Sequence, residues 1–233
     1  MSLNIKIQKH QFQDGAGDCV CPVFYKGEAA VDNQIVFATK NQGKMKEIRA
    51  IMEGTAFRVQ SMEDAGINIE VVEDGGTFEA NALKKAIEIA KVCHTIVLSD
   101  DSGLEIDYLN KAPGVLSARF MGEDTPYPLK NAAILQQLAG VPDEKRTARF
   151  VSVIAAAIPT ANGMDTLTVR ATIEGIIGHE IKGDNGFGYD PIFYVSDHGM
   201  TTAEMPSALK NEISHRGKAL REMRECLVQK LGL

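Results

Sequence analysis

Two long apolar stretches in the middle of the chain, residues 150–158 and 167–177, constrain its fold most. A short polar segment with Asn162 and Gly163 separates them, which is typical of two strands joined in a hairpin. Strands joined by a hairpin run antiparallel. The pair therefore favours a mixed sheet over a purely parallel one.

The rest of the pattern alternates between strand and helix. Residues 35–38 are an apolar run that predicts a buried strand, and the residues after them repeat apolar positions at helical spacing. Thr77 and Ser214 are the expected N-caps of two helices. We expect an α/β fold in which helices flank a long mixed sheet. The predicted helices cover residues 41–52, 77–93, 129–138 and 216–231, and a short strand covers residues 96–98.

Residues 1–33 lack a long periodic run, so we predict an N-terminal extension there and one domain over residues 34–233. The role of the extension is open: it could cover the site, extend a dimer interface, or do neither. It carries Cys19 and Cys21, which could bind a metal together with His10, but their spacing is too short for a usual zinc site. Only four cysteines in 233 residues favour free thiols in a reducing compartment.

The charge and hydropathy of the chain exclude some partners. A net charge of −6 argues against a nucleic-acid coat or a basic membrane-binding surface, although a few local lysines can still bind an anion. No stretch approaches the ~20 apolar residues of a membrane span, and the N-terminus lacks the apolar core of a signal peptide. We expect a cytoplasmic protein with no nucleic-acid or membrane partner.

The segment between the first predicted strand and helix is suited to phosphate binding. A loop that enters a helix presents free N–H groups and the positive end of the helix dipole. It is not a P-loop, because Ala38 and Met45 stand where that motif requires Gly and Ser or Thr. An ordinary tight loop with a solvated lysine is the alternative. The candidate contacts are Thr39, Lys40, Asn41, Gln42, Gly43 and Lys44.

Two adjacent carboxylates, Asp100 and Asp101, follow the strand predicted over residues 96–98. Ligands of α/β sheets bind at strand ends, and adjacent residues of an extended chain point in opposite directions. One carboxylate can therefore face a site while the other faces supporting structure. Glu73, just before the cap Thr77, could join it as a ligand of Mg²⁺. The alternative for the two aspartates is an Asp-rich turn. The alternative for Glu73 is an acidic residue that only interacts with the helix dipole.

The last candidates lie near the C-terminus. In the segment 186–191, glycines flank Phe187, so its ring could stack on a nucleobase. His215 and Arg216 begin the last predicted helix, where donors suit phosphate or a purine carbonyl. A buried aromatic in a glycine-rich loop and an exposed His-Arg pair are the alternatives.

Together, in their order and spacing, these segments resemble the inosine-triphosphate pyrophosphatase family, which removes ITP, dITP and XTP. The resemblance spans about residue 34 to the C-terminus and depends on separated motifs. They are Thr39-Lys40-Asn41-Gln42-Gly43-Lys44, Thr77-Phe78-Glu79-Ala80-Asn81-Ala82, Ser99-Asp100-Asp101-Ser102-Gly103-Leu104, residues 112–119, residues 186–193 and Ile213-Ser214-His215-Arg216-Gly217. Leu116 stands where many members carry Tyr, and residues 1–33 have no counterpart.

The resemblance implies a two-lobed α/β fold, a Mg²⁺ cofactor and a homodimer. It implies Asp101 as general base and metal ligand, Glu73 as the second acidic group at the metal, and Asp100 as their support. Phosphate contacts are implied for Thr39, Asn41, Lys44 and Lys85, and substrate positioning for Ser102. Nucleoside contacts are implied for Phe187, Gly188, Tyr189, Asp190, Lys210, His215 and Arg216.

The implied reaction is attack of an activated water on the α-phosphorus, which releases pyrophosphate. Cationic donors from His215 or Arg216 are expected to bind a 6-keto group and to leave the 6-amino group of adenine mispaired. Two other functions stay open at this point. One is a septum-inhibitor-type pyrophosphatase that acts on modified pyrimidines, and the other is a nucleotide sensor without catalysis. The segments 186–191 and 214–217 argue against the first, and Glu73 with Asp101 against the second.

Overall fold

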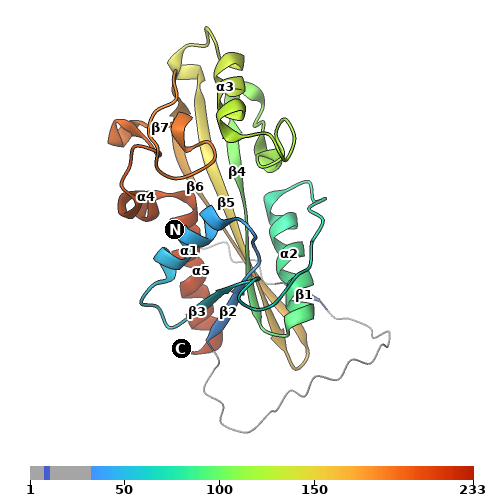
Figure 1. Cartoon of the computed structure of the whole chain (residues 1–233). Coiled ribbons are helices and arrows are strands. Elements are labelled where there is room, and N and C mark those ends of the chain that lie inside the picture. Colours follow the sequence, from blue (N-terminus) through green and yellow to red (C-terminus); the bar gives the residue numbers. More distant parts are fainter. Residues whose placement is uncertain (1–7, 11–32) are drawn as a thin grey trace.

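The computed structural model describes residues 8–10 and 33–233, which form an eight-stranded mixed sheet with helices on both faces (Figure 1). The strand order is β3-β2-β4-β5-β6-β7-β8, and β1 pairs with β6. The strands are β1 (Gln8–His10), β2 (Gln34–Phe37), β3 (Arg58–Ser61), β4 (Ile96–Ile106), β5 (Thr147–Thr160), β6 (Gly163–Ile177), β7 (Phe193–Val195) and β8 (Met200–Thr201). The α-helices are α1 (Gln42–Met52), α2 (Phe78–Cys93), α3 (Tyr127–Gln137), α4 (Ser207–Ile213) and α5 (His215–Leu231).

The sheet has a parallel and an antiparallel part, as the central hairpin predicted. Strand β2 runs parallel to β3 and β4, whereas β4, β5, β6, β7 and β8 pair antiparallel in that order. Strands β5 and β6 pair from Thr147↔Ile176 to Thr160↔Gly163, which confirms the predicted hairpin. These long strands join a lower lobe, which contains β2, β3, α1, α2 and α5, to an upper lobe, which contains α3 and β7 (Figure 1).

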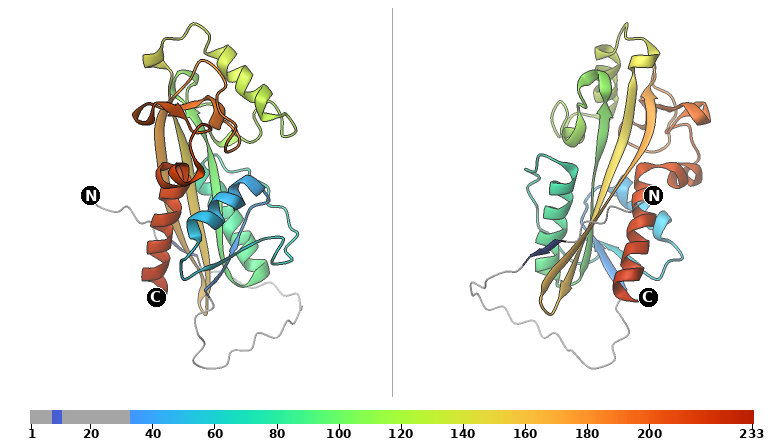
Figure 2. Two further views of the ribbon diagram at one scale, coloured as in Figure 1. Left: turned by 60° about the vertical axis from the view of Figure 1, so that its left-hand side comes forward. Right: turned by 180° about the vertical axis from the view of Figure 1, so that it is seen from behind.

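In the lower lobe, helices cover the two faces of the sheet separately, as the turned views show (Figure 2). Helix α2 lies on one face, where Ala82 and Ala86 pack with Val151 and Val153 of β5. Helices α1 and α5 lie on the other face, where their apolar side chains pack with those of β4 and β5. The upper lobe has its own apolar core around α3, β7 and the upper ends of the long strands. The fold is therefore the predicted α/β type in two lobes.

Both predicted helix caps are confirmed. The Thr77 side chain accepts a hydrogen bond from the backbone N–H of Ala80, and the Ser214 side chain accepts one from Gly217. These caps set the start of α2 and of α5. Since α5 begins at His215, the cap also determines where the predicted His-Arg pair enters the molecule.

The prediction that a strand ends at Leu98, before an acidic turn, is wrong. Strand β4 continues to Ile106 and pairs with β5 along this whole length. Asp100 and Asp101 therefore lie in the interior of a central strand, not in a loop. Polar residues can continue a buried strand because the ladder satisfies their backbone groups, while their side chains find polar partners.

Of the predicted extension, only β1 and Asn33 lie within the described residues. Strand β1 pairs with Met164–Thr166, next to the hairpin turn at the lower end of β6. Cys19 and Cys21 lie outside the described residues, so the suggested metal site with His10 stays a prediction. Among the described residues, no helix is long and apolar enough to cross a membrane.

Candidate active site

A cavity of about 310 Å³ opens between the two lobes, next to the middle of β4. This volume is within the range of small-molecule sites, which is roughly 300–1,000 Å³. Most residues predicted for the site line it, from both ends of the sequence. They are Thr39, Lys40, Asn41, Lys44, Glu73, Lys85, Asp101, Ser102, Phe187, Gly188, Tyr189, Asp190, Lys210, His215 and Arg216.

The start of α1 forms one wall of this cavity. Asn41 is the N-cap, and its side chain accepts a hydrogen bond from the backbone N–H of Lys44 at 3.0 Å. The Thr39 hydroxyl accepts one from the N–H of Asn41 at 3.1 Å. Of the six predicted contacts in this loop, Gln42 and Gly43 do not line the cavity. Gln42 is exposed at the first position of α1, whereas Gly43 packs against Phe187.

Two lysine side chains enter the cavity from different helices. Lys44 of α1 and Lys85 of α2 both donate to the main-chain carbonyl of Asp100, at 3.3 and 3.0 Å. Burial lowers the pKa of Lys44, and the positive charges of Lys85 and Arg216 lower it further against the opposing effect of Asp100. Two cations held this close together form a site that favours a polyanion.

Asp100 and Asp101 point to opposite faces of β4. Asp100 shares its face with Leu98 and turns toward α1 and α5, while Asp101 shares its face with Val97 and turns toward α2. This confirms the predicted division of the two carboxylates. Asp101 lines the cavity, and Asp100 does not.

Asp100 is held as a carboxylate by its neighbours. It accepts hydrogen bonds from Ser152 at 2.8 Å and from Nε of Arg216 at 2.9 Å, and its Oδ2 lies 3.1 Å from Nζ of Lys44. Burial raises its pKa, but the charges of Arg216 and Lys44 and the Ser152 hydrogen bond outweigh burial. The pKa of Asp100 therefore lies well below its ordinary value.

Asp101 has the opposite electrostatic environment. Burial raises its pKa to about 6, against the lowering effects of Lys85 and Lys44 and with a further rise from Glu73. Its Oδ2 is buried and has no hydrogen-bond partner. Glu73 lies nearby, because Lys85 Nζ is 2.6 Å from Glu73 Oε1 and 3.9 Å from Asp101 Oδ1. A partly desolvated carboxyl with a free oxygen in a polar cavity can accept a proton or bind a cation.

The donor set at this point fits a hard divalent cation. Glu73 and Asp101 offer carboxylate oxygens on either side of Lys85, and the unpartnered Asp101 Oδ2 is a free ligand atom. Among the described residues there is no cluster of three or more His, Cys, Asp or Glu side chains that could enclose a metal. Mg²⁺ does not need one, since it takes one or two carboxylates together with phosphate oxygens and water.

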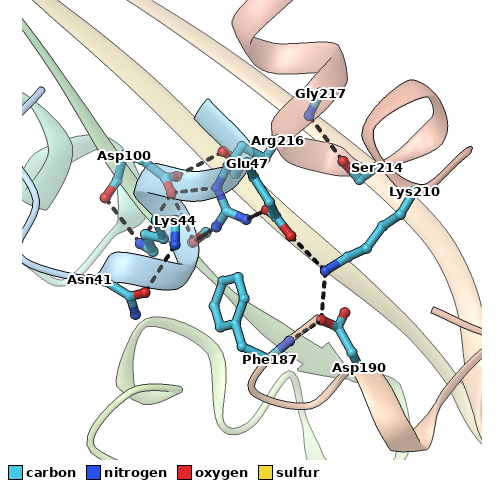
Figure 3. Close-up of polar contacts among 12 residues, drawn as sticks. Asn41, Lys44, Glu47, Asp100, Phe187, Asp190, Lys210, Ser214, Arg216 and Gly217 are labelled. Carbon is cyan, nitrogen blue, oxygen red and sulfur yellow. Dashed lines mark hydrogen bonds and ion pairs between the residues drawn. The ribbon is translucent and has the colours of Figure 1, made fainter. Parts of the chain in front are cut away.

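A buried ion network lies on the Asp100 side of the cavity (Figure 3). Arg216 donates to Asp100, to the hydroxyl of Ser102 at 2.9 Å and to Glu47. Lys210 Nζ lies 2.7 Å from Glu47 and 2.6 Å from Asp190. The charges of Arg216 and Lys210 outweigh burial and lower the pKa of Glu47. The network fixes α1, α4 and α5 relative to one another.

Phe187 lies over this network, with its ring centroid 5.2 Å from Lys210 Nζ and 5.5 Å from Arg216 Cζ. Its backbone N–H donates to Asp190 at 2.8 Å. Tyr189 is buried instead, and its hydroxyl donates to the carbonyl of Ser117 at 2.7 Å. Of the predicted aromatic segment, Phe187 therefore presents a ring to the cavity, while Tyr189 and Asp190 anchor the loop.

Of the two residues predicted as cationic donors to the 6-keto group, His215 or Arg216, His215 is not a cation. His215 is buried and stacks on Phe150, with ring centroids 5.0 Å apart, and its Nδ1 has no partner. Burial holds its pKa well below the ordinary value, and the neighbouring Arg216 lowers it further. His215 is therefore neutral at physiological pH and has one N–H donor and one acceptor nitrogen.

Three polar residues near the site had no predicted role. Glu47 lies three positions after Lys44, so helical spacing could have placed both on one face of α1. Asn81 is buried on α2 and accepts a hydrogen bond from the N–H of Gly75 at 2.8 Å. Arg119 donates to the main-chain carbonyl of Glu73 at 3.1 Å. The contacts of Asn81 and Arg119, and the pairing of Glu47 with Arg216, required the fold.

The chain is similar to known proteins over most of its length. The model of the Ham1 family matches residues 35–226. The dITP/XTP pyrophosphatases of Bacillus licheniformis and Bacillus subtilis are 45% and 44% identical to this chain. The alignments cover 84% and 83% of this chain and 98% and 96% of those proteins.

Solved structures agree with this. A HAM1 protein from Coxiella burnetii has a TM-score of 0.75 and 37% identity, over 84% of this chain and 98% of its own. The Ham1 protein of Staphylococcus aureus has a TM-score of 0.75 and 36% identity, over 84% and 99%. These similarities confirm the resemblance inferred from the separated motifs. The chain therefore belongs to the Ham1 family.

Proposed function

We propose that this chain hydrolyses non-standard purine nucleoside triphosphates (ITP, dITP and XTP) to the monophosphate and pyrophosphate, with Mg²⁺ as cofactor. The observation that carries the proposal is the side chain of Asp101, which lines a cavity shared with Glu73 and two lysines and whose buried Oδ2 has no hydrogen-bond partner. The relatives named dITP/XTP pyrophosphatases support this substrate class.

Glu73 and Asp101 are the residues that would hold Mg²⁺ together with the triphosphate. When bound, the ion neutralises phosphate charge and lowers the pKa of water. Lys44 and Lys85, which approach each other at the Asp100 carbonyl, bind the triphosphate chain and offset the charge of the leaving pyrophosphate. The free N–H groups at the start of α1 assist them.

Asp101 acts as the general base. With a pKa of about 6 it is mostly a carboxylate at pH 7 to 8, yet it is basic enough to accept a proton. It takes a proton from water while the water oxygen forms a bond to the α-phosphorus. The bond from that phosphorus to the oxygen bridging to the β-phosphate breaks, and its electron pair leaves with pyrophosphate. Asp101 then returns the proton to solvent.

The preference for one nucleobase over another depends on neutral hydrogen-bond donors in the cavity. Phe187 stacks on the purine ring, and the N–H of neutral His215 donates to a 6-keto oxygen. Adenine presents an amino donor there, so one buried polar pair is left unsatisfied, which discriminates by roughly 1–3 kcal/mol for each such group. Guanine shares the 6-keto group, so its rejection requires a second contact near the 2-position.

A nucleotide panel tests this proposal. The purified chain is incubated with ITP, XTP, dITP, GTP, ATP and a modified pyrimidine triphosphate, with and without Mg²⁺, and pyrophosphate and orthophosphate are measured separately. We expect Mg²⁺-dependent pyrophosphate release from ITP and XTP at least about tenfold faster than from ATP, which corresponds to 1.4 kcal/mol. Equal turnover of ATP would refute the specificity, and preference for the pyrimidine would favour a septum-inhibitor-type enzyme.

We also propose a cytoplasmic location, because nucleotide pools are used there. The homodimer implied by the resemblance stays a prediction, which sedimentation equilibrium of the purified chain would test.

A further inference from the structure

Asn81 contacts the segment that carries Glu73 and lies beside Asp101, but it has no assigned role. It is fully buried on α2, one helical turn before Lys85 and on the same face of that helix. Lys85 extends toward both Glu73 and Asp101. Asn81 does not itself line the cavity, so it acts on the two acids only through contacts within the protein.

One end of this carboxamide holds the segment that carries Glu73. Asn81 Oδ1 accepts a hydrogen bond from the backbone N–H of Gly75, two residues after Glu73, at 2.8 Å. The contact is close enough that a Cβ added to Gly75 would lie 2.6 Å from Asn81 Oδ1. The segment from residue 67 to 77 contains no helix or strand, so side-chain contacts of this kind determine its position.

The other end of the carboxamide is unused. Asn81 Nδ2 and Asp101 Oδ2 are both buried atoms without a hydrogen-bond partner, one an obligate donor and the other an obligate acceptor. Asp101 turns toward the face of the sheet that α2 covers. Asn81 also lowers the pKa of Asp101, which agrees with a donor beside that carboxylate. Leaving both atoms unpaired costs roughly 1–3 kcal/mol each, so their pairing is favoured.

We propose that Asn81 is a positioning residue for the acidic pair: its Oδ1 anchors the Glu73 segment through Gly75, and its Nδ2 donates to Asp101 Oδ2. A carboxylate oxygen has two lone pairs, so Oδ2 keeps one for a metal ion. One rigid amide on a helix then determines the separation between two carboxylates that come from different parts of the chain. The inference rests on the proposed roles of Glu73 and Asp101. Residues that orient metal ligands in this way typically change metal affinity or activity by about 10–100-fold when they are replaced.

Two variants remove the contact from its two sides. Asn81→Ala deletes the carboxamide. Gly75→Ala inserts a methyl group 2.6 Å from Asn81 Oδ1 and 2.9 Å from Ala80 Cβ, while leaving the sequence of α2 unchanged. A third variant, Asn81→Asp, keeps the acceptor for Gly75 and removes the donor to Asp101. Asn131→Ala is the matched contrast, since Asn131 is also a buried helical Asn that bonds a glycine backbone, Gly188, but on the nucleobase side.

The first readout is binding of Mn²⁺ alone, measured by calorimetry or electron paramagnetic resonance, which does not depend on turnover. We expect Asn81→Ala and Gly75→Ala to weaken Mn²⁺ binding by about tenfold or more. Asn131→Ala should leave it unchanged. If wild-type protein binds no Mn²⁺, or if both variants bind it within twofold of wild type, the inference is overturned.

The second readout separates kcat from KM for ITP. Asn81→Ala and Asn81→Asp should lower kcat by about 10-fold or more with KM within threefold, while Asn131→Ala should mainly raise KM. Changes of KM alone in the Asn81 variants would also overturn the inference. Failure of wild-type protein to release pyrophosphate would refute the proposed function instead, and the Mn²⁺ measurement would still decide the role of Asn81. Should Asn81→Ala not fold, Gly75→Ala gives the decision.

Discussion

Asp100 and Asp101 are consecutive residues of one strand, yet their carboxyl groups lie on opposite faces of the sheet and their pKa values shift in opposite directions. Asp100 is surrounded by Arg216, Lys44 and Ser152, whose charges and hydrogen bond lower its pKa despite burial. Burial raises the pKa of Asp101 to about 6, although the charges of Lys85 and Lys44 lower it. Environments that separate two neighbouring acids in this way distinguish a structural carboxylate from a proton acceptor.

Replacing Asp101 by Asn should abolish most catalysis. General-base catalysis typically contributes 10²–10⁴-fold, so Asp101→Asn should lower kcat for ITP by about that factor. Nucleotide affinity should change little, because Lys44, Lys85 and Phe187 remain. Steady-state kinetics and equilibrium binding of ITP would measure both. A kcat within about threefold of wild type would remove Asp101 as the base.

The same variant should stabilise the metal-free protein in a pH-dependent way. The folded pKa of Asp101, about 6, lies above its ordinary value of 3.8, so folding favours the protonated form. The resulting cost to stability is absent below about pH 4 and complete above about pH 6 to 7. At about 1.4 kcal/mol per pKa unit, it amounts to roughly 1–3 kcal/mol.

Urea unfolding in EDTA would measure this effect. Asp101→Asn should raise the free energy of unfolding at pH 8, and the gain should shrink as the pH falls toward 4.5. An equal gain in the free energy of unfolding at both pH values, or no gain at pH 8, would contradict the claim that burial of the Asp101 carboxylate destabilises the protein.

Glu47 should be important for stability. It bridges Lys210 and Arg216, which lower its pKa in spite of burial, so its stabilisation is present at neutral pH and is lost as the pH falls below about 4. Glu47→Gln should lower the free energy of unfolding by roughly 3 kcal/mol at pH 7, because the buried charges of Lys210 and Arg216 lose one of their carboxylate partners. Denaturant titration measures this loss. Glu53→Gln, an exposed acid just after the same helix, should change stability by less than about 0.5 kcal/mol. Equal effects of the two variants would show that the network is not stabilising.

Gly43→Ala should separate binding from stability. An added Cβ would lie 2.9 Å from Cδ1 of Phe187, so the ring must move from its place at the cavity. The backbone of α1 accepts alanine readily, with a gain of up to about 1 kcal/mol. We therefore expect an unchanged or higher melting temperature and a KM for ITP raised about 5- to 20-fold. An unchanged KM would show that Phe187 does not contact the nucleobase.

Signals within a few residues predicted the local elements well. Thr77 and Ser214 cap their helices as expected, and the Asn-Gly turn marks the hairpin of β5 and β6. The opposite orientation of Asp100 and Asp101 followed from strand geometry alone. Each of these features depends on neighbours in the sequence, so its pattern is visible without the fold.

Features that depend on distant partners were not predictable in this way. Two serines and two aspartates interrupt the apolar pattern of β4, and only pairing with β5 shows that the strand continues to Ile106. Glu47 bonds Arg216 from 169 positions away, and no periodicity reports such a contact. The neutral state of His215 likewise depends on burial by residues from several elements.

Hydrolysis of ITP in ¹⁸O-labelled water tests the central claim most directly, because the label marks the phosphorus that water attacks. With Asp101 activating water toward the α-phosphorus, mass spectrometry should find one ¹⁸O atom in inosine monophosphate and none in pyrophosphate. Label in pyrophosphate, or orthophosphate as the primary product, would show attack at another phosphorus and contradict the account.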